Sequence, residues 1–221
     1  MIWVGRLMSF AVVLQTIEFF WVRFYPSEIV AAEFPAWLRW TLCRERWILT
    51  LRLLAAISAL TWPTIAGVGV MLLTTWWLAV RWRGTFNGGS DFMTFHILAA
   101  WLLCLCFPSL ERVSVGYVVI QLILAYFVAG MAKVANSSWR SGAAPRIFLQ
   151  RRGIEIGGSL CLLMAWSIIS FEMLFPLSIL RPWPFVAAGV LFHLANVYTF
   201  GLNRFFFAWL AAYPALFYLA R

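Results

Sequence analysis

Long apolar segments follow one another along nearly the whole chain, and this feature limits the fold most strongly. A segment of about 20 apolar residues has the length of a helix that crosses a bilayer. The 221 residues are 64% hydrophobic and only 11% charged, so they cannot give a water-soluble domain its polar surface. We therefore expect an all-α, polytopic transmembrane helix bundle, with residues 1–221 forming a single transmembrane domain.

Turn signals and charged residues divide this apolar sequence into predicted spans. Residues 47–80 are too many for one ordinary crossing, and Pro63 can break them into a hairpin of two spans. Residues 27–46 mix apolar and charged side chains, which is typical of an interfacial amphipathic segment. The other predicted spans cover residues 2–22, 92–107, 113–133, 156–175, 184–200 and 205–219. The sequence thus predicts about eight spans, or seven if the hairpin is one long tilted helix.

Basic residues are distributed unevenly over this arrangement. The net charge of +9 comes from 17 Lys and Arg against eight Asp and Glu. One side would carry Arg23, Arg39, Arg44, Arg46, Arg52, Arg81, Arg83, Arg140, Arg146, Arg151, Arg152 and Arg204, and the other only Arg6, Arg112, Arg181 and Arg221. Loops rich in Arg face the cytoplasm and its anionic leaflet, so we predict lipid partners and no nucleic acid. Both termini would then lie outside, in a bacterial inner or intracytoplasmic membrane.

Ionisable side chains within the predicted spans are candidates for a functional site, because charge inside a membrane is costly. They are Glu18, Asp91, His96, Lys133, Glu172 and His193. Tyr126, Gly130 and Lys133 are spaced at i, i+4 and i+7, so they share one helical face. A glycine on that face allows another backbone to approach closely.

Lys133 and Glu172 each have two interpretations. A lysine in an apolar pocket can be neutral and accept a proton from a phenol or quinol. A lysine at a helix end can equally extend its ammonium group to the lipid headgroups. Glu172, like Glu18, is an acidic partner for Lys133 or for an arginine, and an ion pair would explain it without catalysis.

Gly189, His193 and Asn196 form a second polar stripe with the same spacing. His193 could ligate a metal or a pigment, or donate a hydrogen bond to a substrate oxygen. A histidine satisfied by a neighbouring Tyr, Asn or carbonyl is the simpler interpretation. Two histidines, and four cysteines without CxxC spacing, predict no metal cluster.

The aromatic residues do not identify a cofactor. The 14 Trp and 20 Phe can stack on quinones, carotenoids or chlorins. Interfacial aromatic belts and helix packing require the same residues. The sequence therefore names no cofactor.

Three stretches combine polar residues in a distinctive order and spacing. They are Phe86-Asn87-Gly88-Gly89-Ser90-Asp91, then residues 126–134 followed by Ser138-Trp139-Arg140-Ser141-Gly142, and Phe171-Glu172 with Phe192-His193. Together they resemble the horizontally transferred transmembrane (HTTM) family, which includes the membrane part of vitamin K-dependent gamma-carboxylase. The likeness covers residues 51–206, and its most specific piece is the aromatic-x-x-Ala-Gly-x-x-Lys…Trp-x-x-Gly element.

The resemblance implies roles for two residues. Lys133 would stand where carboxylase-like members carry the lysine that deprotonates vitamin K hydroquinone. His193 would match a histidine in the family's Phe-His element. The 221 residues do not include the large soluble domain of the carboxylase, so we do not expect them to carry out full carboxylation.

Two functions follow from these patterns, with transport as a third. The first is a non-catalytic accessory subunit of a larger membrane complex of photosynthetic or respiratory type, with hetero-oligomeric membrane partners. The second is a quinone-coupled membrane enzyme with Lys133 as base and with His193 or Glu172 positioning the substrate. In that enzyme the cofactor would lie against Tyr126, Gly130 and Asn196.

Overall fold

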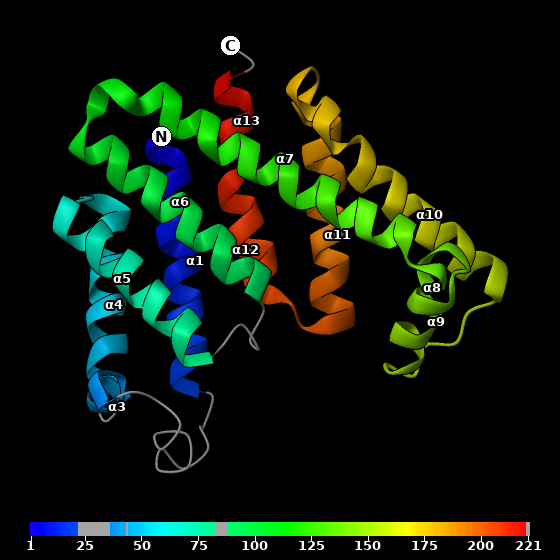
Figure 1. Ribbon diagram of the computed structural model, residues 1–221, viewed down its shortest axis with the longest axis horizontal. Helices are drawn as coiled ribbons and strands as arrows, with labels where there is room; N and C mark the ends of the chain where they lie inside the picture. Colours follow the sequence, from blue (N-terminus) through cyan, green and yellow to red (C-terminus); the bar gives the residue numbers. More distant parts are fainter. Residues whose placement is uncertain (22–35, 43, 83–87, 220–221) are drawn as a thin grey trace. The chain divides into compact units, whose positions relative to one another are not determined.

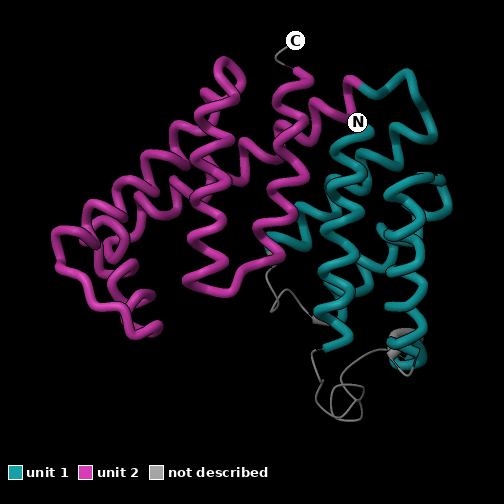
Figure 2. The backbone as a smooth tube through the Cα atoms, turned by 180° about the vertical axis from the view of Figure 1, so that it is seen from behind, with its two compact units in different colours: residues 1–111 teal, residues 112–221 magenta. Residues whose placement is uncertain are grey.

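The computed structural model describes residues 1–21, 36–42, 44–82 and 88–219. Every regular element in these ranges is a helix, and no strand occurs among them (Figure 1). The chain divides into two compact units, residues 1–111 and 112–221 (Figure 2). The all-α prediction is confirmed for the described residues, and the expectation of one domain stays a prediction.

Unit 1 is a bundle of helices packed on one another. Its elements are α1 (Ile2–Trp21), α3 (Ala36–Leu42), α4 (Glu45–Thr61), α5 (Ile65–Trp82), α6 (Gly88–Cys106) and the 3-10 helix η1 (Pro108–Leu110). Helix α1 packs on α4 and α6, and α5 packs on both α4 and α6. The predicted break in the long apolar segment is confirmed, because α4 ends at Thr61 and α5 begins at Ile65.

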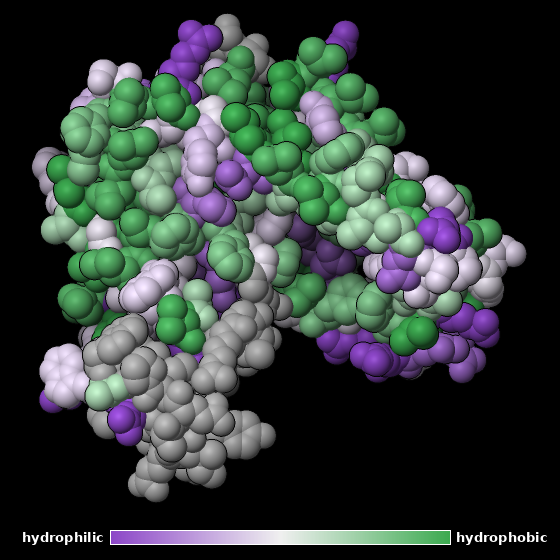
Figure 3. All heavy atoms as spheres, viewed as in Figure 1, coloured by the Kyte–Doolittle hydropathy of each residue, from purple (hydrophilic) through white to green (hydrophobic). Residues whose placement is uncertain are grey.

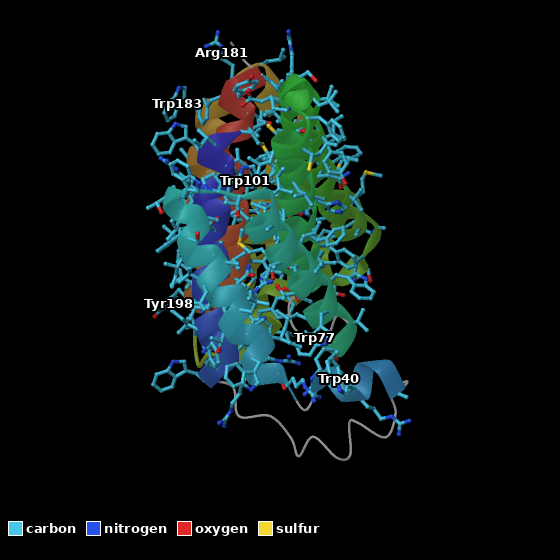
Figure 4. All side chains as sticks on the ribbon, turned by 90° about the vertical axis from the view of Figure 1, so that its left-hand side faces the viewer. Trp40, Trp77, Trp101, Arg181, Trp183 and Tyr198 are labelled. Atoms are coloured by element: carbon cyan, nitrogen blue, oxygen red, sulfur yellow. The ribbon has the colours of Figure 1, made fainter. Side chains whose placement is uncertain are left out.

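A small residue allows α1 and α6 to pack closely. Gly5 lies against the indole ring of Trp101, which is 2% exposed, and a Cβ on Gly5 would overlap that ring. At the other end of the unit, Trp77 Nε1 donates a hydrogen bond to Thr41 Oγ1 at 2.8 Å and joins α5 to α3 (Figure 4). Small residues at helix contacts and paired indole N–H groups are typical of membrane bundles.

Unit 2 contains the residues of both predicted polar stripes. Its elements are α7 (Glu111–Ala135), α8 (Ser137–Arg140), α9 (Ala143–Gln150), α10 (Gly158–Leu174), η2 (Phe175–Ile179), α11 (Pro182–Phe200), α12 (Asn203–Ala212) and α13 (Pro214–Leu219). The short helices α8 and α9 pack on α10, and α11 packs on α12 and η2. Gly142 makes the turn from α8 to α9 with a positive φ of 76°, a conformation that glycine adopts without a steric penalty.

Among the described residues, five helices are long and apolar enough to cross a membrane. They are Ile2–Trp21, Gly89–Cys106, Pro108–Ala135, Gly158–Ile179 and Pro182–Phe200, while Ile65–Arg81 is a shorter apolar helix. These helices make the chain compatible with a multi-pass membrane protein, and the count of eight spans stays a prediction. The helix predicted over residues 205–219 differs, because it is interrupted at Tyr213 between α12 and α13. Pro214 lacks an N–H group and cannot continue the helical hydrogen bonds.

Several predictions fall partly outside the described ranges, among them the positions of Arg23, Arg83 and Arg221 in the charge distribution. The interfacial segment over residues 27–46 is described only from residue 36 onward, with residue 43 also outside, and there it contains the helix α3. Phe86 and Asn87 of the first motif lie outside the described residues as well.

Candidate functional site

The polar face predicted on α7 packs against α10. Tyr126 and Gly130 are buried, and Lys133 is half-buried at the end of the helix. A Cβ on Gly130 would come within 3.0 Å of the Met173 nitrogen and 3.1 Å of Glu172 Cβ. The missing side chain of Gly130 therefore lets the two backbones approach, and this approach brings Glu172 to Lys133.

Lys133 and Glu172 form a two-pronged ion pair. Lys133 Nζ lies 2.8 Å from Glu172 Oε1 and 2.7 Å from Oε2. The side chain of Glu172 is 4% exposed and that of Lys133 is 18% exposed. The ammonium also lies 5.1 Å from the centroid of the Trp139 ring, in a cation–π contact. The amine of Lys133 thus has both oxygens of a buried carboxylate as hydrogen-bond acceptors.

A second cluster lies about two turns earlier on α7. The Tyr126 hydroxyl is 2.7 Å from His193 Nε2 and 2.6 Å from the Tyr213 hydroxyl. Gly189, one turn before His193 on α11, leaves room for the Tyr213 hydroxyl, which a Cβ at that position would overlap. Three elements, α7, α11 and the α12–α13 junction, therefore meet through one phenol oxygen.

Aromatic rings surround this Tyr126 cluster, defined as Tyr126, His193 and Tyr213. Phe175 stacks on Tyr126 with ring centroids 3.9 Å apart, and Phe171 meets the same ring edge-on at 5.4 Å. Trp209 contacts both Tyr126 and His193. A hydrogen bond between a hydroxyl and an imidazole in such surroundings is strong and well oriented, because little water competes for either group.

The donor and acceptor roles within the cluster determine which nitrogen of His193 carries its proton. If Tyr213 donates to Tyr126 and Tyr126 donates to Nε2, then His193 carries its own proton on Nδ1. Nδ1 is buried and has no hydrogen-bond partner among the described residues. The arrangement therefore ties three helical elements together through two short hydrogen bonds.

The other predicted site residues lie apart from these contacts. Asn196 is near the end of α11, where its carbonyl accepts hydrogen bonds from the N–H groups of Gly201 and Leu202. Its side chain is not among the groups that contact Tyr126 or Lys133. Glu18, Asp91 and His96 belong to unit 1, and the acidic partner of Lys133 is Glu172.

Unit 1 holds a buried arginine, Arg52, although its position in the sequence predicted a place on the basic, cytoplasm-facing side. Arg52 on α4 is 1% exposed. Its guanidinium donates to Thr16 Oγ1 at 3.1 Å and to Gln15 Oε1 at 3.2 Å on α1. It also donates to Thr75 Oγ1, at 2.5 Å, on α5.

The acceptors of Arg52 explain how a cation is kept inside the bundle. The hydroxyls of Thr16 and Thr75 each donate to a carbonyl in the preceding turn of their own helix, so their lone pairs face the guanidinium. The signal in the sequence was the set of polar residues in apolar helices, Gln15-Thr16 and Thr74-Thr75. Their convergence on Arg52 depends on how α1, α4 and α5 pack.

Two more arginines placed on the same basic side are also buried. Arg81 is 6% exposed, with its Nη2 3.6 Å from the Glu45 carboxylate, and Arg204 is buried on α12. Counting arginines by position therefore overstates the charge of that side, because long side chains can turn into the bundle and find acceptors there.

Metal ligation receives no support from the described part of the chain, where no group of three or more His, Cys, Asp or Glu side chains is placed to hold an ion. Comparisons with protein-family models, with curated proteins and with solved structures find no match to this chain. The geometry of the Lys133–Glu172 pair and of the Tyr126 cluster is thus the basis for a functional assignment.

Proposed function

We propose that this protein is a non-catalytic accessory subunit of a larger membrane protein complex, of the kind found in photosynthesis or respiration. The observation that carries the proposal is the Lys133–Glu172 ion pair. An enzymatic interpretation needs Lys133 as a free base, yet its ammonium is already bound to both oxygens of a buried carboxylate. Mutual pairing by itself can keep two charges inside a membrane bundle, so this pair requires no catalytic role.

The exposed surface of α11 supports the same proposal. This helix is the least buried of the five membrane-length helices, and only Gly189 and His193 on it are buried. Trp183 and Tyr198, near its two ends, point outward (Figure 4). Wide apolar helix faces of this type are covered by lipid or by neighbouring helices.

The test is extraction of the protein from its native membrane in mild detergent, followed by native mass determination of the extracted species. We expect migration with a much larger assembly. We also expect Lys133→Ala/Glu172→Gln to leave that assembly largely intact, because both charges of the pair are removed together and no buried charge is left unpaired. A protein that runs alone, without partner chains, would contradict the proposal.

A second candidate function is a quinone-coupled membrane enzyme, and the Tyr126 cluster favours it. The cluster and Lys133 share α7, and the phenol and imidazole groups of the cluster are of the kinds that position a quinol oxygen through hydrogen bonds. The resemblance to the HTTM family assigns Lys133 to the base of this reaction. In that case Glu172 would have to release the ammonium when substrate binds.

This alternative has its own test. A lipid extract of the purified protein would contain a quinone, and quinol turnover by the full chain would be lost in Lys133→Ala. Normal turnover in Lys133→Ala would exclude Lys133 as the base. Loss of turnover together with an intact bound quinone would favour the enzyme over the subunit.

A further inference from the structure

One end of unit 2 collects the C-terminal ends of two membrane-length helices. Helix α7 ends at Ala135 and α11 ends at Phe200, while α10 begins at Gly158 near the same end. The α8–α9 segment, residues 137–153, covers this end and packs on α10. The backbone of Leu162 lies so close to Gly142 that a Cβ there would come within 2.7 Å of it, so the segment is fixed to α10.

Two arginines of this segment hold the helix ends. Arg140 Nη1 donates to the carbonyls of Val134 and Ala135 at 2.6 and 3.0 Å. Arg152 Nε donates to the Thr199 carbonyl at 2.5 Å. The last carbonyls of a helix carry partial negative charge, and a guanidinium neutralises it. Arg140 and Arg152 thus have a structural role that fixes the segment at the ends of α7 and α11.

Two other arginines of the segment have exposed side chains. Arg146 on α9 and Arg151 just after it are exposed, and no acidic side chain in the described part of unit 2 forms an ion pair with either of them. Glu155 is the one acidic residue between positions 133 and 157. Hydrophilic side chains gather over α9 and the turn that follows it, at the lower right of Figure 3.

Helix α9 is itself amphipathic. Ala144, Pro145 and Leu149 are buried against the unit, whereas Arg146 and the apolar Ile147, which is 48% exposed, face outward. An exposed apolar side chain beside exposed arginines is typical of a helix that lies in the headgroup region of a bilayer.

We propose that the α8–α9 segment is a binding site for the phosphate headgroups of anionic lipids, with Arg146 and Arg151 as the residues that contact the phosphate. Charge complementarity supports this occupant, because a planar guanidinium binds phosphate oxygens in pairs. The location also supports it, because the ends of membrane-length helices lie at headgroup depth. Juxtamembrane arginines are attracted to anionic leaflets.

The experiment uses the full chain in a neutral detergent and counts retained lipids by native mass spectrometry. Phosphatidylglycerol or phosphatidylcholine is added at equal concentrations. We expect wild-type protein to retain phosphatidylglycerol in preference, and Arg146→Gln/Arg151→Gln to retain it on the order of tenfold less. The matched control is Arg112→Gln/Arg181→Gln, which removes two exposed arginines from the opposite end of unit 2 and should retain the lipid as wild type does.

Three outcomes would overturn the proposal. One is equal retention of the two lipids by wild-type protein, and another is unchanged retention by Arg146→Gln/Arg151→Gln. The third is displacement of the lipid by inorganic phosphate alone, which would assign the site to free phosphate instead. Because Arg146 and Arg151 are exposed, both variants should fold, and circular dichroism with size-exclusion chromatography checks this. Restored retention in Arg146→Lys/Arg151→Lys would further support a site that depends on charge.

Discussion

Lys133 and Glu172 each remove much of the electrostatic cost of the other within unit 2. Glu172 is almost fully buried, and its carboxylate has the Lys133 ammonium as its ion-pair partner. A buried ion pair contributes little net stability compared with apolar residues of the same shape, but removal of one member leaves an uncompensated charge. The pair therefore constrains which substitutions the bundle accepts.

A double-mutant cycle tests this coupling. We expect Lys133→Met to cost roughly 2–4 kcal/mol of the free energy of unfolding, somewhat below the range for a fully buried pair because Lys133 is partly exposed. Glu172→Gln should also be destabilising, and the Lys133→Met/Glu172→Gln double variant should lose less than the sum of the two. Denaturant unfolding in micelles measures all three variants. Additive losses would show that the two groups are not coupled.

The Tyr126 hydroxyl is the shared partner of two buried polar groups. In Tyr126→Phe, His193 Nε2 and the Tyr213 hydroxyl would both lose their partner, which should cost about 1–3 kcal/mol for a buried group left unsatisfied. The control is Tyr198→Phe, because Tyr198 is 78% exposed on the same unit and its hydroxyl should contribute little. Equal thermal midpoints for the two variants would mean that the Tyr126 hydrogen bonds do not stabilise the unit.

Among the elements of unit 1, α1, α4 and α5 are joined by the guanidinium of Arg52. We expect Arg52→Lys to destabilise the unit by about 1–3 kcal/mol, because an ammonium has only three donors at one point and cannot reach acceptors on both neighbouring helices. Arg46→Lys is the matched control, since Arg46 is exposed on the same helix. Thermal unfolding followed by circular dichroism compares them, and equal midpoints would contradict a linking role for Arg52.

The contact between α1 and α6 depends on Gly5. In Gly5→Ala the added methyl group would meet the Trp101 ring, and such overpacking should cost about 1–3 kcal/mol. Gly69→Ala on α5 is the control, because a Cβ there has no atom within 4 Å, and alanine favours a helix over glycine by about 1 kcal/mol. The two variants should therefore shift the thermal midpoint in opposite directions. A neutral Gly5→Ala would show that the helices separate easily at this point.

At the scale of the whole molecule, orientation in the membrane remains a prediction from charge. The exposed Ser141 lies between α8 and α9, next to Gly142, which packs against Leu162 near the start of α10, and the exposed Leu180 follows η2 beyond the other end of α10. A crossing α10 would therefore place them on opposite sides of the membrane. In a background with Cys43, Cys104, Cys106 and Cys161 replaced, we expect a membrane-impermeant maleimide to label Ser141→Cys only from the cytoplasm. Leu180→Cys should be labelled only from the other side. Labelling of both from one side would contradict a crossing by α10.

The sequence by itself predicted the helices of this protein, because backbone groups in apolar surroundings must pair within one segment and a helix does so locally. The same local logic located the break before Ile65, and it placed Tyr126, Gly130 and Lys133 on one face of α7. The predicted span over residues 205–219 was wrong as one helix, because Pro214 cannot continue the helical hydrogen bonds and the helix is interrupted at Tyr213. Local rules thus predict where most of the helices lie and which residues share a helical face.

Only the tertiary structure decided which polar groups meet. Lys133 and Glu172 are 39 residues apart, Tyr126 and Tyr213 are 87 apart, and Arg52 finds its acceptors on two other helices. The sequence proposed Glu172 as one partner among several and assigned Arg52 to a basic, cytoplasm-facing side. Such pairings depend on helix rotation and on the close approaches that glycines permit, and these are set by the packing of side chains from distant segments.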